Sequence, residues 1–361
     1  MTVVAVLGGG AGGLASSVDL TLANHEVRLW NRHRPALLHL MDDRVVRFVG
    51  EPGESSVTLS KVTTDLDEAL DGAEVVVVSL PALAHEALFT DLADIHCSVP
   101  VVLNPGHTGG ALHARAIFRR LGATLPPVAE LSTLMHVARV TADGSVAITL
   151  RAGHVRAACL PGGESALDAA TSLFAGVSIE SDVMASSLSN VNMVLHPPGA
   201  ILAAAWVEAH DKDFTFYVDA LTPGVANVIR VLDQERRAVA EGFGHRLPSL
   251  IDEMRRVGTA TGLPGDDDVV AAIRGGLANQ SIKAPVSLHD RYYEEDLPFA
   301  VAPLTVFADL VGVAVPMARA LLTVGGGLLG RDLSATGLGA TELGIEGLDL
   351  EGVLQIVRGC A

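Results

Sequence analysis

Residues 3–17 begin as a short apolar run, break into glycines and then continue as a segment suited to a helix. Within this stretch, Gly8, Gly10 and Gly13 fit the spacing G-x-G-x-x-G. The first glycine of this pattern allows a tight turn, the second lets the backbone approach a pyrophosphate, and the third lets the helix pack against the strand. A glycine-rich chain matches such a pattern by chance, but the β-branched strand before the glycines and a second strand at 25–30 favour a dinucleotide site.

The residues after the second predicted strand bear on the choice of nicotinamide cofactor. An Asp or Glu at the end of that strand would bind the adenosine ribose hydroxyls of NAD, whereas arginine pairs with a 2′-phosphate. No acid ends the strand here, and Asn31 is followed by Arg32 and Arg34. The sequence therefore favours NADP(H) over NAD(H). In the alternative, both arginines are solvated on an exposed loop and Asn31 binds the ribose of NAD.

Buried strands alternate with helices through the first half of the chain. The run at 74–80 is apolar almost throughout, as expected of a strand covered on both faces of a parallel sheet. Helices are expected at 82–95 and 111–121, on either side of a strand at 99–103. This alternation predicts a doubly wound, Rossmann-type α/β domain, in which ligands bind beyond the carboxyl ends of the strands.

The loops at that edge of the predicted sheet are candidates for further cofactor contacts. Leu80 and Pro81 end the apolar run, and Asn104 follows the next strand. Small residues around them would allow backbone contact with the nicotinamide and its ribose, although ordinary loop chemistry explains each residue equally well. His107, in the second loop, is interpreted as a surface or helix-capping histidine.

The length of 361 residues suggests two domains. Strand patterns fade near residue 185, so we expect a dinucleotide-binding domain over 1–185 and an all-α substrate domain over 186–361. Within the second domain, helices are expected at 199–209, 224–241, 248–259, 266–273, 304–311 and 317–323. The most hydrophobic window, 297–322, contains an aspartate and three prolines, which favours two packed helices over a membrane span.

Charge and cysteine content exclude several classes of function. The net charge of −17 would repel the phosphates of a nucleic acid over most of the surface, so no such partner is expected. Cys97, Cys159 and Cys360 are widely spaced without a CxxC pair, which argues against a disulfide framework or a zinc site and for a reducing compartment. With no signal peptide recognised at the start, a cytoplasmic protein without a metal is expected. The apolar helical half is compatible with a homodimer.

Two polar segments stand out in the predicted helical domain: Leu195-His196-Pro197-Pro198, and the residues from Arg291 to Asp296 and Pro298. Proline suits the first turn of a helix, so His196 is expected directly before a helix, with its ring near the helix N-terminus. Asp296 could then tune the imidazole as a proton donor near neutral pH. Spacing alone favours the plainer interpretation, in which the histidine caps a helix and the acidic residues form a surface cluster.

In this order, the glycine-rich start, the Leu195–Pro198 segment and the Arg291-x-x-x-x-Asp296-x-Pro298 segment resemble the octopine/nopaline or opine dehydrogenases. The resemblance covers nearly the whole chain, and its second-domain motifs are the more specific ones. The acid that NAD-using members carry after the second strand is replaced here by Asn31 and the arginines that follow.

The resemblance implies a role for four residues of the second domain. His196 and Asp296 correspond to a proton-handling couple, and Arg291 to the residue that holds a substrate carboxylate. Asn192, one helical turn before the histidine, matches a polar position near the substrate. The implied reaction is a reductive condensation, in which the amino group of an amino acid attacks an α-keto acid such as pyruvate and hydride from the nicotinamide reduces the resulting C=N bond.

Two alternatives remain open at this point. A related reductase could act on a keto or hydroxy acid without an amine, as ketopantoate reductases and glycerol-3-phosphate dehydrogenases do. A nucleotide-binding sensor would bind NADPH without turnover. Amine-independent reduction of a keto acid distinguishes the first alternative from an opine-type enzyme, and binding without any reaction distinguishes the second.

Overall fold

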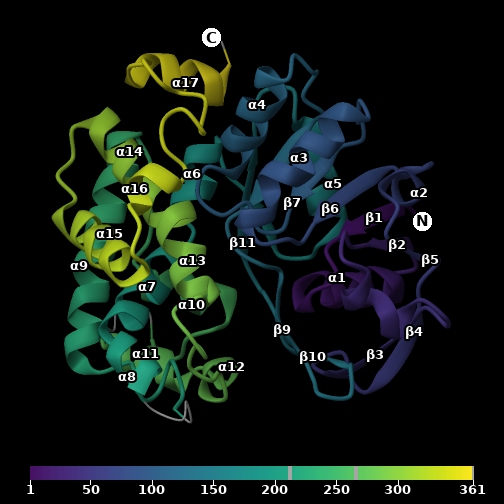
Figure 1. Cartoon of the computed structure of the whole chain (residues 1–361), viewed down its shortest axis with the longest axis horizontal. Coiled ribbons are helices and arrows are strands. Elements are labelled where there is room, and N and C mark those ends of the chain that lie inside the picture. The colour runs from purple at the N-terminus through teal and green to yellow at the C-terminus, as the bar shows by residue number, and fades with distance from the viewer. Residues whose placement is uncertain (210–213, 264–266, 360–361) are drawn as a thin grey trace. The chain divides into compact units, whose positions relative to one another are not determined.

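The computed structural model describes residues 1–209, 214–263 and 267–359 (Figure 1). The chain forms two compact units. Unit 1 comprises Met1–Gly106 and Ile117–Ile179, and unit 2 comprises His107–Ala116 and Glu180–Ala361. The segment at 107–116 therefore groups with the helical half, a feature that a single break in the sequence does not capture. The domain bounds of 1–185 and 186–361 stay a prediction.

Unit 1 is built on an eight-stranded sheet with the order β12-β11-β8-β7-β6-β1-β2-β5. Neighbouring strands are parallel except β8 and β11. The order reverses beside β1, which lies between β2 and β6, so the predicted doubly wound sheet is confirmed. The strands are β1 (Val3–Leu7), β2 (Glu26–Trp30), β5 (Lys61–Thr63), β6 (Val75–Val78), β7 (Val101–Leu103), β8 (Val128–Leu131), β11 (Val155–Cys159) and β12 (Val177–Ile179).

The strands and helices of unit 1 follow the hydrophobic pattern closely. All four residues of β6 are at most 2% exposed, as expected of a strand covered on both faces. The helix predicted at 82–95 is divided into a 3-10 turn and α3. The helical elements that begin before residue 180 are α1 (Ala11–Leu22), η1 (Arg34–Leu40), α2 (Leu66–Leu70), η2 (Ala82–Ala84), α3 (His85–Asp94), α4 (Gly110–Arg120) and α5 (Glu164–Leu173).

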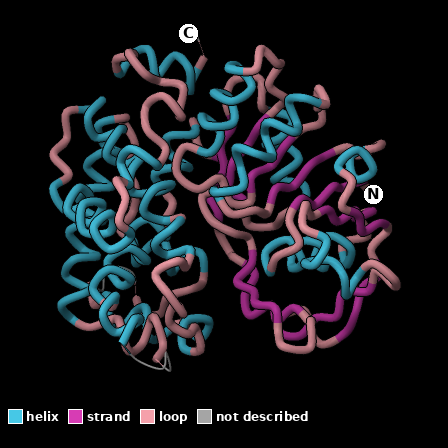
Figure 2. The backbone as a smooth tube through the Cα atoms, viewed as in Figure 1, coloured by secondary structure: helices cyan, strands magenta, loops and turns pink. Residues whose placement is uncertain are grey.

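A second, four-stranded sheet of unit 1 has the order β4-β3-β10-β9 (Figure 2, magenta). It consists of β3 (Val45–Gly50), β4 (Ser55–Thr58), β9 (His136–Val140) and β10 (Val146–Arg151). Asp19 on α1 links this helix to the second sheet, because its carboxylate pairs with His136 on β9 and with Arg151 on β10. Burial raises the pKa of Asp19, but these two partners lower it by more, so the carboxylate stays charged.

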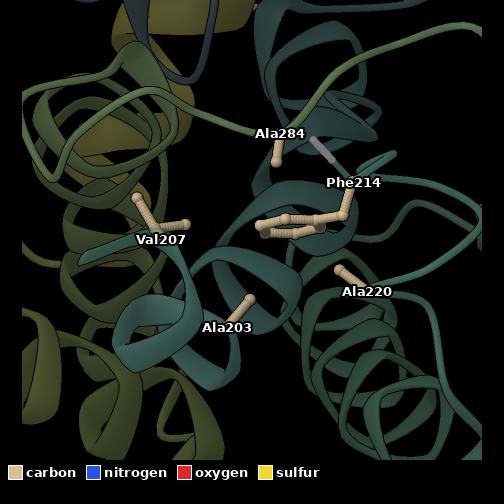
Figure 3. Packing of buried hydrophobic residues seen from close by; sticks show 5 residues of the cluster. All are labelled: Ala203, Val207, Phe214, Ala220 and Ala284. Carbon is tan, nitrogen blue, oxygen red and sulfur yellow. The ribbon is translucent and has the colours of Figure 1, made fainter. Parts of the chain in front are cut away.

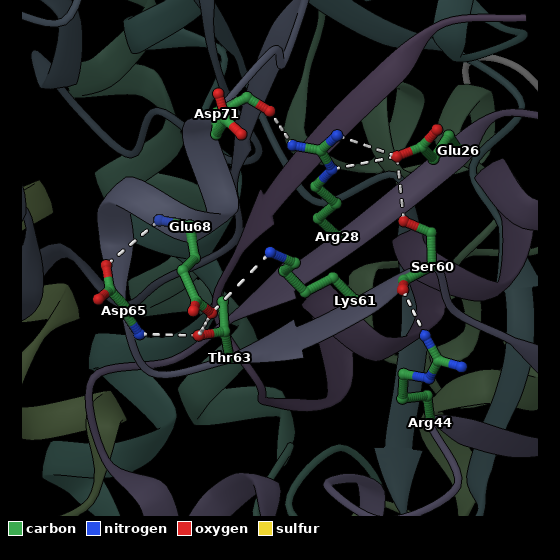
Figure 4. A network of polar contacts seen from close by, with 9 residues as sticks. All are labelled: Glu26, Arg28, Arg44, Ser60, Lys61, Thr63, Asp65, Glu68 and Asp71. Carbon is green, nitrogen blue, oxygen red and sulfur yellow. Dashed lines mark hydrogen bonds and ion pairs between the residues drawn. The ribbon is translucent and has the colours of Figure 1, made fainter.

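The β2–β5 edge of the large sheet is closed by polar contacts (Figure 4). Arg28 on β2 donates to Glu26 and to the main-chain oxygen of Asp71. On β5, the Thr63 hydroxyl donates to Glu68 Oε2 at 2.8 Å. Asp65 accepts from the main-chain N–H of Glu68 and caps α2.

The regular elements among the described residues of unit 2 are all helices, and the sole β pairing there is an isolated bridge between Thr215 and Lys283. Local capping explains several helix ends: Thr222 caps α9, where Pro223 is the first residue, and the Glu235 carboxylate accepts from two main-chain N–H groups at the start of α15. The helices are α6 (Val183–Leu188), α7 (Asn192–Leu202), α8 (Ala204–Ala209), α9 (Pro223–Gly242), α10 (Leu250–Val257), α11 (Val269–Gly275), α12 (Leu277–Gln280), α13 (Arg291–Glu294), η3 (Leu297–Val301), α14 (Ala302–Val311), α15 (Pro316–Leu329), α16 (Leu333–Thr336) and α17 (Leu350–Arg358).

The hydrophobic window at 297–322 forms η3, α14 and the first half of α15, and α14 contacts α15. Within the described residues, no helix is both long enough and apolar enough to cross a membrane. The expectation of two packed helices is confirmed. Of the helix predicted at 266–273, residue 266 lies outside the described residues, and the helix in this region, α11, begins at Val269.

A small apolar cluster anchors the loop residues from Phe214 onward. Phe214 packs among Ala203, Val207, Ala220 and Ala284 (Figure 3), and its ring stacks on Trp206 with 4.0 Å between centroids. These contacts fix Phe214 against α7 and α8, and thereby set the positions of Phe216 and Tyr217, which follow it in the chain.

Candidate functional site

The glycine-rich loop of unit 1 has the geometry that the three glycines predict. Gly8 has φ +132°, and a Cβ there would lie 2.3 Å from the Ser79 oxygen. A Cβ on Gly13 would lie 1.8 Å from the Gly8 oxygen, so only glycine allows α1 to approach the strand this closely. A Cβ on Gly10 would meet no atom within 4 Å. The open side of the loop is therefore at Gly10, where the pattern expects a pyrophosphate.

This loop also lies at the point where the sheet reverses. Gly8 follows β1, and Leu80 and Pro81 follow the neighbouring β6, so both loops lie at the carboxyl ends of adjacent strands. Leu80 Cδ2 is 3.2 Å from the position of a Cβ on Gly8. The residues fit a dinucleotide, and the contacts predicted for Leu80 and Pro81 stay predictions.

The side chain of Asn104 is used within unit 1. It is fully buried, donates to the Ser16 hydroxyl at 3.2 Å and accepts from the Met135 N–H at 3.0 Å. Its amide is thus committed to contacts within unit 1, and no part of the residue is exposed. Its cofactor role stays a prediction, but with this restriction.

The residues after β2 differ from one another in their surroundings. Asn31 Oδ1 accepts from the Gly9 N–H at 3.1 Å, so this side chain supports the glycine-rich loop directly. Arg32 is paired with Asp91 at 2.5 Å. Arg34 is exposed at the start of η1. A 2′-phosphate bound by Arg32 would compete with Asp91 for the guanidinium, whereas no such competition is seen among the described residues at Arg34.

His196 lies in the interior of α7, and here the sequence-based expectation is wrong. The helix begins at Asn192, not at residue 199, and Pro197 and Pro198 lie inside it. Two prolines cannot donate to the carbonyls four residues earlier, those of Met193 and Val194, which is why a helix through them is not expected locally. The imidazole is therefore not at a helix N-terminus.

His196 and Asp296 are nevertheless in direct contact. Asp296 Oδ2 is 2.7 Å from His196 Nδ1, and both residues are at most 5% exposed. Because an ionised carboxylate only accepts hydrogen bonds, Nδ1 carries the proton and Nε2 is the nitrogen left to exchange one. The alternative of a surface acidic cluster does not describe Asp296. Asp296 directly precedes the π-helix η3, which contacts α7, as α13 also does.

Three aromatic residues surround this imidazole. The Tyr217 hydroxyl is 2.6 Å from His196 Nε2. The Tyr292 ring lies over the imidazole with 4.3 Å between centroids, and Phe216 stacks on Tyr292 at 4.4 Å. A Cβ on Gly199 would lie 3.0 Å from the Phe216 ring, so the glycine after the two prolines admits this packing.

Arg291 adds a positive group beside the pair. Its Nε is 3.6 Å from Glu295 Oε2, and its side chain is 43% exposed. Burial lowers the pKa of Arg291, but the carboxylates of Asp296 and Glu295 raise it by more, with smaller contributions from Tyr292 and Tyr217. The guanidinium is thus held near the histidine–aspartate pair with part of its surface available.

Glu295 has a second partner that corrects an earlier interpretation. His107 Nε2 is 3.3 Å from Glu295 Oε1, and His107 is only 5% exposed. His107 is therefore neither a surface residue nor a simple helix cap. Consecutive acids, Glu295 and Asp296, each pair with a buried histidine.

Asn192 is the first residue of α7 and is half-buried. Its main-chain N–H donates to Asn190 Oδ1 at 3.1 Å, and the Asn190 amide donates to the Thr108 hydroxyl. Its position four residues before His196 matches the expected spacing. Its role toward a substrate stays a prediction.

Sequence reasoning missed Tyr217, Phe216 and the His107–Glu295 pair. One signal was present: the chain has only three tyrosines, and Tyr217, Tyr292 and Tyr293 all meet α7. The Tyr293 hydroxyl donates to the Ala200 oxygen at 2.7 Å. Among the residues that the structure describes, no group of three His, Cys, Asp or Glu side chains is placed to hold a metal ion.

Comparisons with known proteins agree with this division of the chain. Residues 179–329 match the family model described as NAD/NADP octopine/nopaline dehydrogenase, alpha-helical domain, and residues 3–104 match NAD-dependent glycerol-3-phosphate dehydrogenase N-terminus. An opine dehydrogenase of Arthrobacter sp. (strain 1C) is 30% identical over 98% of both chains. Vitopine synthase of Allorhizobium ampelinum is 24% identical over 93% of this chain and 94% of that one.

Solved structures share the fold. An octopine dehydrogenase with NADH and L-arginine has a TM-score of 0.76 at 20% identity and covers 100% of this chain and 99% of its own. A yersinopine dehydrogenase with NADP⁺ has a TM-score of 0.68 at 16% identity and covers 99% and 98%. These two structures contain different cofactors, NADH and NADP⁺, so the comparisons support NAD(P) without a preference.

Proposed function

Because the chain belongs to the opine dehydrogenase family and is an NAD(P)-dependent oxidoreductase acting on CH–NH donors, we propose that it condenses an amino acid with an α-keto acid such as pyruvate. The product is a secondary amine dicarboxylate, and the same site would catalyse the reverse oxidation. The observation that carries this proposal is the buried contact of 2.7 Å between His196 Nδ1 and Asp296.

In this proposal His196 and Asp296 handle the protons of the condensation. The ammonium group of the amino acid must lose a proton before its nitrogen can attack the keto carbon, and loss of water from the resulting carbinolamine requires one. Asp296 holds the Nδ1–H tautomer and stabilises the imidazolium, so that His196 can take up the first proton and supply the second. When bound, the reduced nicotinamide supplies the electron pair and hydrogen that reduce the C=N bond.

We assign the binding of a substrate carboxylate to Arg291. The Arg291 Nε pairs with Glu295 at 3.6 Å, and the side chain is 43% exposed. The terminal N–H groups of the guanidinium can therefore donate to a substrate carboxylate in a bidentate contact. Such a contact would orient the keto carbon. A chain with a net charge of −17 needs a local positive site of this kind to hold an acidic substrate. Asn192 would contribute a further polar contact.

For the cofactor, we propose NADP(H) over NAD(H), held by Gly8, Gly10 and Gly13 with Arg34 at the 2′-phosphate. Arg32 would contribute only after releasing Asp91. The test compares the dissociation constants of NADPH and NADH for Arg34→Glu and Arg32→Glu. Arg120→Glu is a matched control, because Arg120 forms a similar exposed pair with Glu86 at 2.7 Å. We expect selective loss of NADPH affinity in Arg34→Glu, and equal loss of both cofactors would contradict the assignment.

The activity is tested by NADPH or NADH oxidation with pyruvate and each of a panel of amino acids, and the product is identified by its mass. The proposal expects turnover that requires both substrates. Reduction of the keto acid without an amine would instead identify a hydroxy-acid reductase. Cofactor binding without turnover for any pair would favour the sensor.

Two further properties stay predictions from the sequence. Cys97 and Cys159 are free thiols, and burial raises the pKa of each, in keeping with inert thiols in a reducing compartment such as the cytoplasm. Cys360 lies outside the described residues. The proposed homodimer is tested by the mass of the protein in solution.

A further inference from the structure

The nitrogen through which His196 can exchange protons is occupied by a tyrosine. Nδ1 donates to Asp296, so Nε2 is the only ring nitrogen that remains for proton exchange. The Tyr217 hydroxyl lies 2.6 Å from Nε2, and Tyr217 is 5% exposed. A proton that reaches His196 must therefore pass through this hydroxyl or wait until Tyr217 leaves.

The loop that carries Tyr217 is held on both sides, which argues against its leaving. The Phe216 N–H donates to the Ile282 oxygen at 2.8 Å, and the Ala284 N–H donates to the Phe214 oxygen at 2.9 Å. The Asp219 carboxylate closes the turn by accepting from both the N–H and the hydroxyl of Thr215.

The side chains on either side of Tyr217 are equally constrained. Phe214 is packed in the apolar cluster of Figure 3 and stacked on Trp206. Phe216 is packed against Gly199 and stacked on Tyr292. Withdrawal of the Tyr217 hydroxyl from Nε2 would disturb both rings, so the fixed arrangement favours passage of the proton through the hydroxyl.

We propose that Tyr217 is a catalytic residue that relays protons between His196 Nε2 and the substrate. A tyrosine hydroxyl suits this role because it accepts one hydrogen bond while donating another. The relay rests on the proposed condensation, since it assigns a path for the protons of that reaction. Tyr217 also contributes to the raised pKa of Arg291, so the hydroxyl is within electrostatic reach of the group assigned to a substrate carboxylate.

The proton balance of the relay closes in both directions. When the carbinolamine loses water, its C–O bond breaks and the departing oxygen takes the Tyr217 proton, while the nitrogen lone pair forms the C=N bond of an iminium ion. Tyr217 regains a proton from Nε2 of the imidazolium, which becomes neutral imidazole. In the earlier step, the substrate ammonium group first gives one proton along the same path to Nε2. The resulting amine then attacks the keto carbon, and the nitrogen of the adduct passes a second proton to the alkoxide oxygen to form the carbinolamine.

The test is Tyr217→Phe, with Tyr293→Phe as a matched control. Both substitutions remove one buried hydroxyl beside α7, but the Tyr293 hydroxyl donates to a main-chain oxygen and does not contact His196. We expect Tyr217→Phe to lower kcat by about 10- to 100-fold, with KM and cofactor affinity nearly unchanged and an altered pH profile. Tyr293→Phe should keep kcat within about twofold, at the level of an indirect packing change.

Two results would overturn the relay. If Tyr217→Phe keeps the kcat and pH profile of the wild type, the hydroxyl has no catalytic part. If kcat rises or KM falls, the hydroxyl blocks the histidine instead of serving it. If no amino acid and keto acid pair reacts with the wild-type enzyme, the proposed function fails first, so the two failures are distinguishable.

A measurement on the unchanged protein covers the case in which the variant does not fold. In mixtures of H2O and D2O, a relay moves two protons in one step, and kcat should depend on the deuterium fraction along a curve. A linear dependence indicates transfer of a single proton and would also overturn the relay.

Discussion

Asp296→Asn isolates what the carboxylate contributes at His196. The substitution keeps the size of the side chain and removes only its charge, at a contact of 2.7 Å between residues that are at most 5% exposed. A hydrogen bond to a charged group contributes about 1.5–3 kcal/mol. Since about 1.36 kcal/mol corresponds to a tenfold change in rate, kcat should fall by roughly 10- to 150-fold. An amide that donates to Nδ1 would hold the wrong tautomer and increase the loss.

The assay is turnover of the best amino acid and keto acid pair at saturating cofactor. Because Asp296 is assigned to proton handling, cofactor affinity should stay within about twofold of the wild type. A double-mutant cycle strengthens the test. His196→Ala alone should lower kcat by about 100-fold or more, and adding Asp296→Asn should lower it little further, because the aspartate acts through the histidine. An additive loss, or an unchanged kcat in Asp296→Asn, would refute the couple.

Three further outcomes test the structure away from this pair. Arg236→Met should lower the free energy of unfolding in urea by about 3–5 kcal/mol, because it leaves the buried Asp233 without its ion-pair partner at 2.7 Å. Gly10→Ala should melt at the wild-type temperature, since its Cβ meets no protein atom within 4 Å, yet bind either cofactor at least about tenfold more weakly. Burial raises the pKa of Asp182, but His245 and Arg358 lower it to below its usual 3.8. Asp182 therefore contributes stability that is present above pH 3.8 and lost as pH falls through its folded pKa, so Asp182→Asn should flatten the acid side of a stability–pH curve.

The fold of unit 1 could be predicted because its signals are local. A β-branched run such as β6 is compatible with little except a strand buried on both faces. Gly8 and Gly13 are positions where a Cβ would collide with main chain, so the glycine pattern reported a real constraint. Asn104 shows the limit of this reasoning. Its place at the end of a strand was predicted from the sequence. The local sequence could not reveal that its side-chain amide forms hydrogen bonds with Ser16 and Met135.

The candidate site could be predicted only in part, since its contacts join distant segments. The His196–Asp296 contact spans a hundred positions and came from a resemblance, not from spacing. Tyr217 reaches Nε2 because Phe214 anchors its loop in a cluster with four other buried residues. No local rule places a loop residue of this kind, because its position depends on how α7, α8 and the segment near Ala284 pack together.

The sequence predicts that a helix begins after Pro197 and Pro198, whereas α7 continues through both prolines. The packing at this turn gives a reason for the Pro-Pro-Gly sequence. Pro197 and Pro198 leave two carbonyls of α7 without helical donors, and Gly199 removes the side chain that would exclude the Phe216 ring. The helix therefore lacks two main-chain hydrogen bonds at the turn that carries His196, where the aromatic loop approaches. Local rules in natural proteins are most often broken where function requires it. We therefore expect Gly199→Leu to displace Phe216 and, through it, Tyr217, and so to lower kcat as Tyr217→Phe does. The turn at which the helix prediction is wrong is thus the turn that positions the proposed relay.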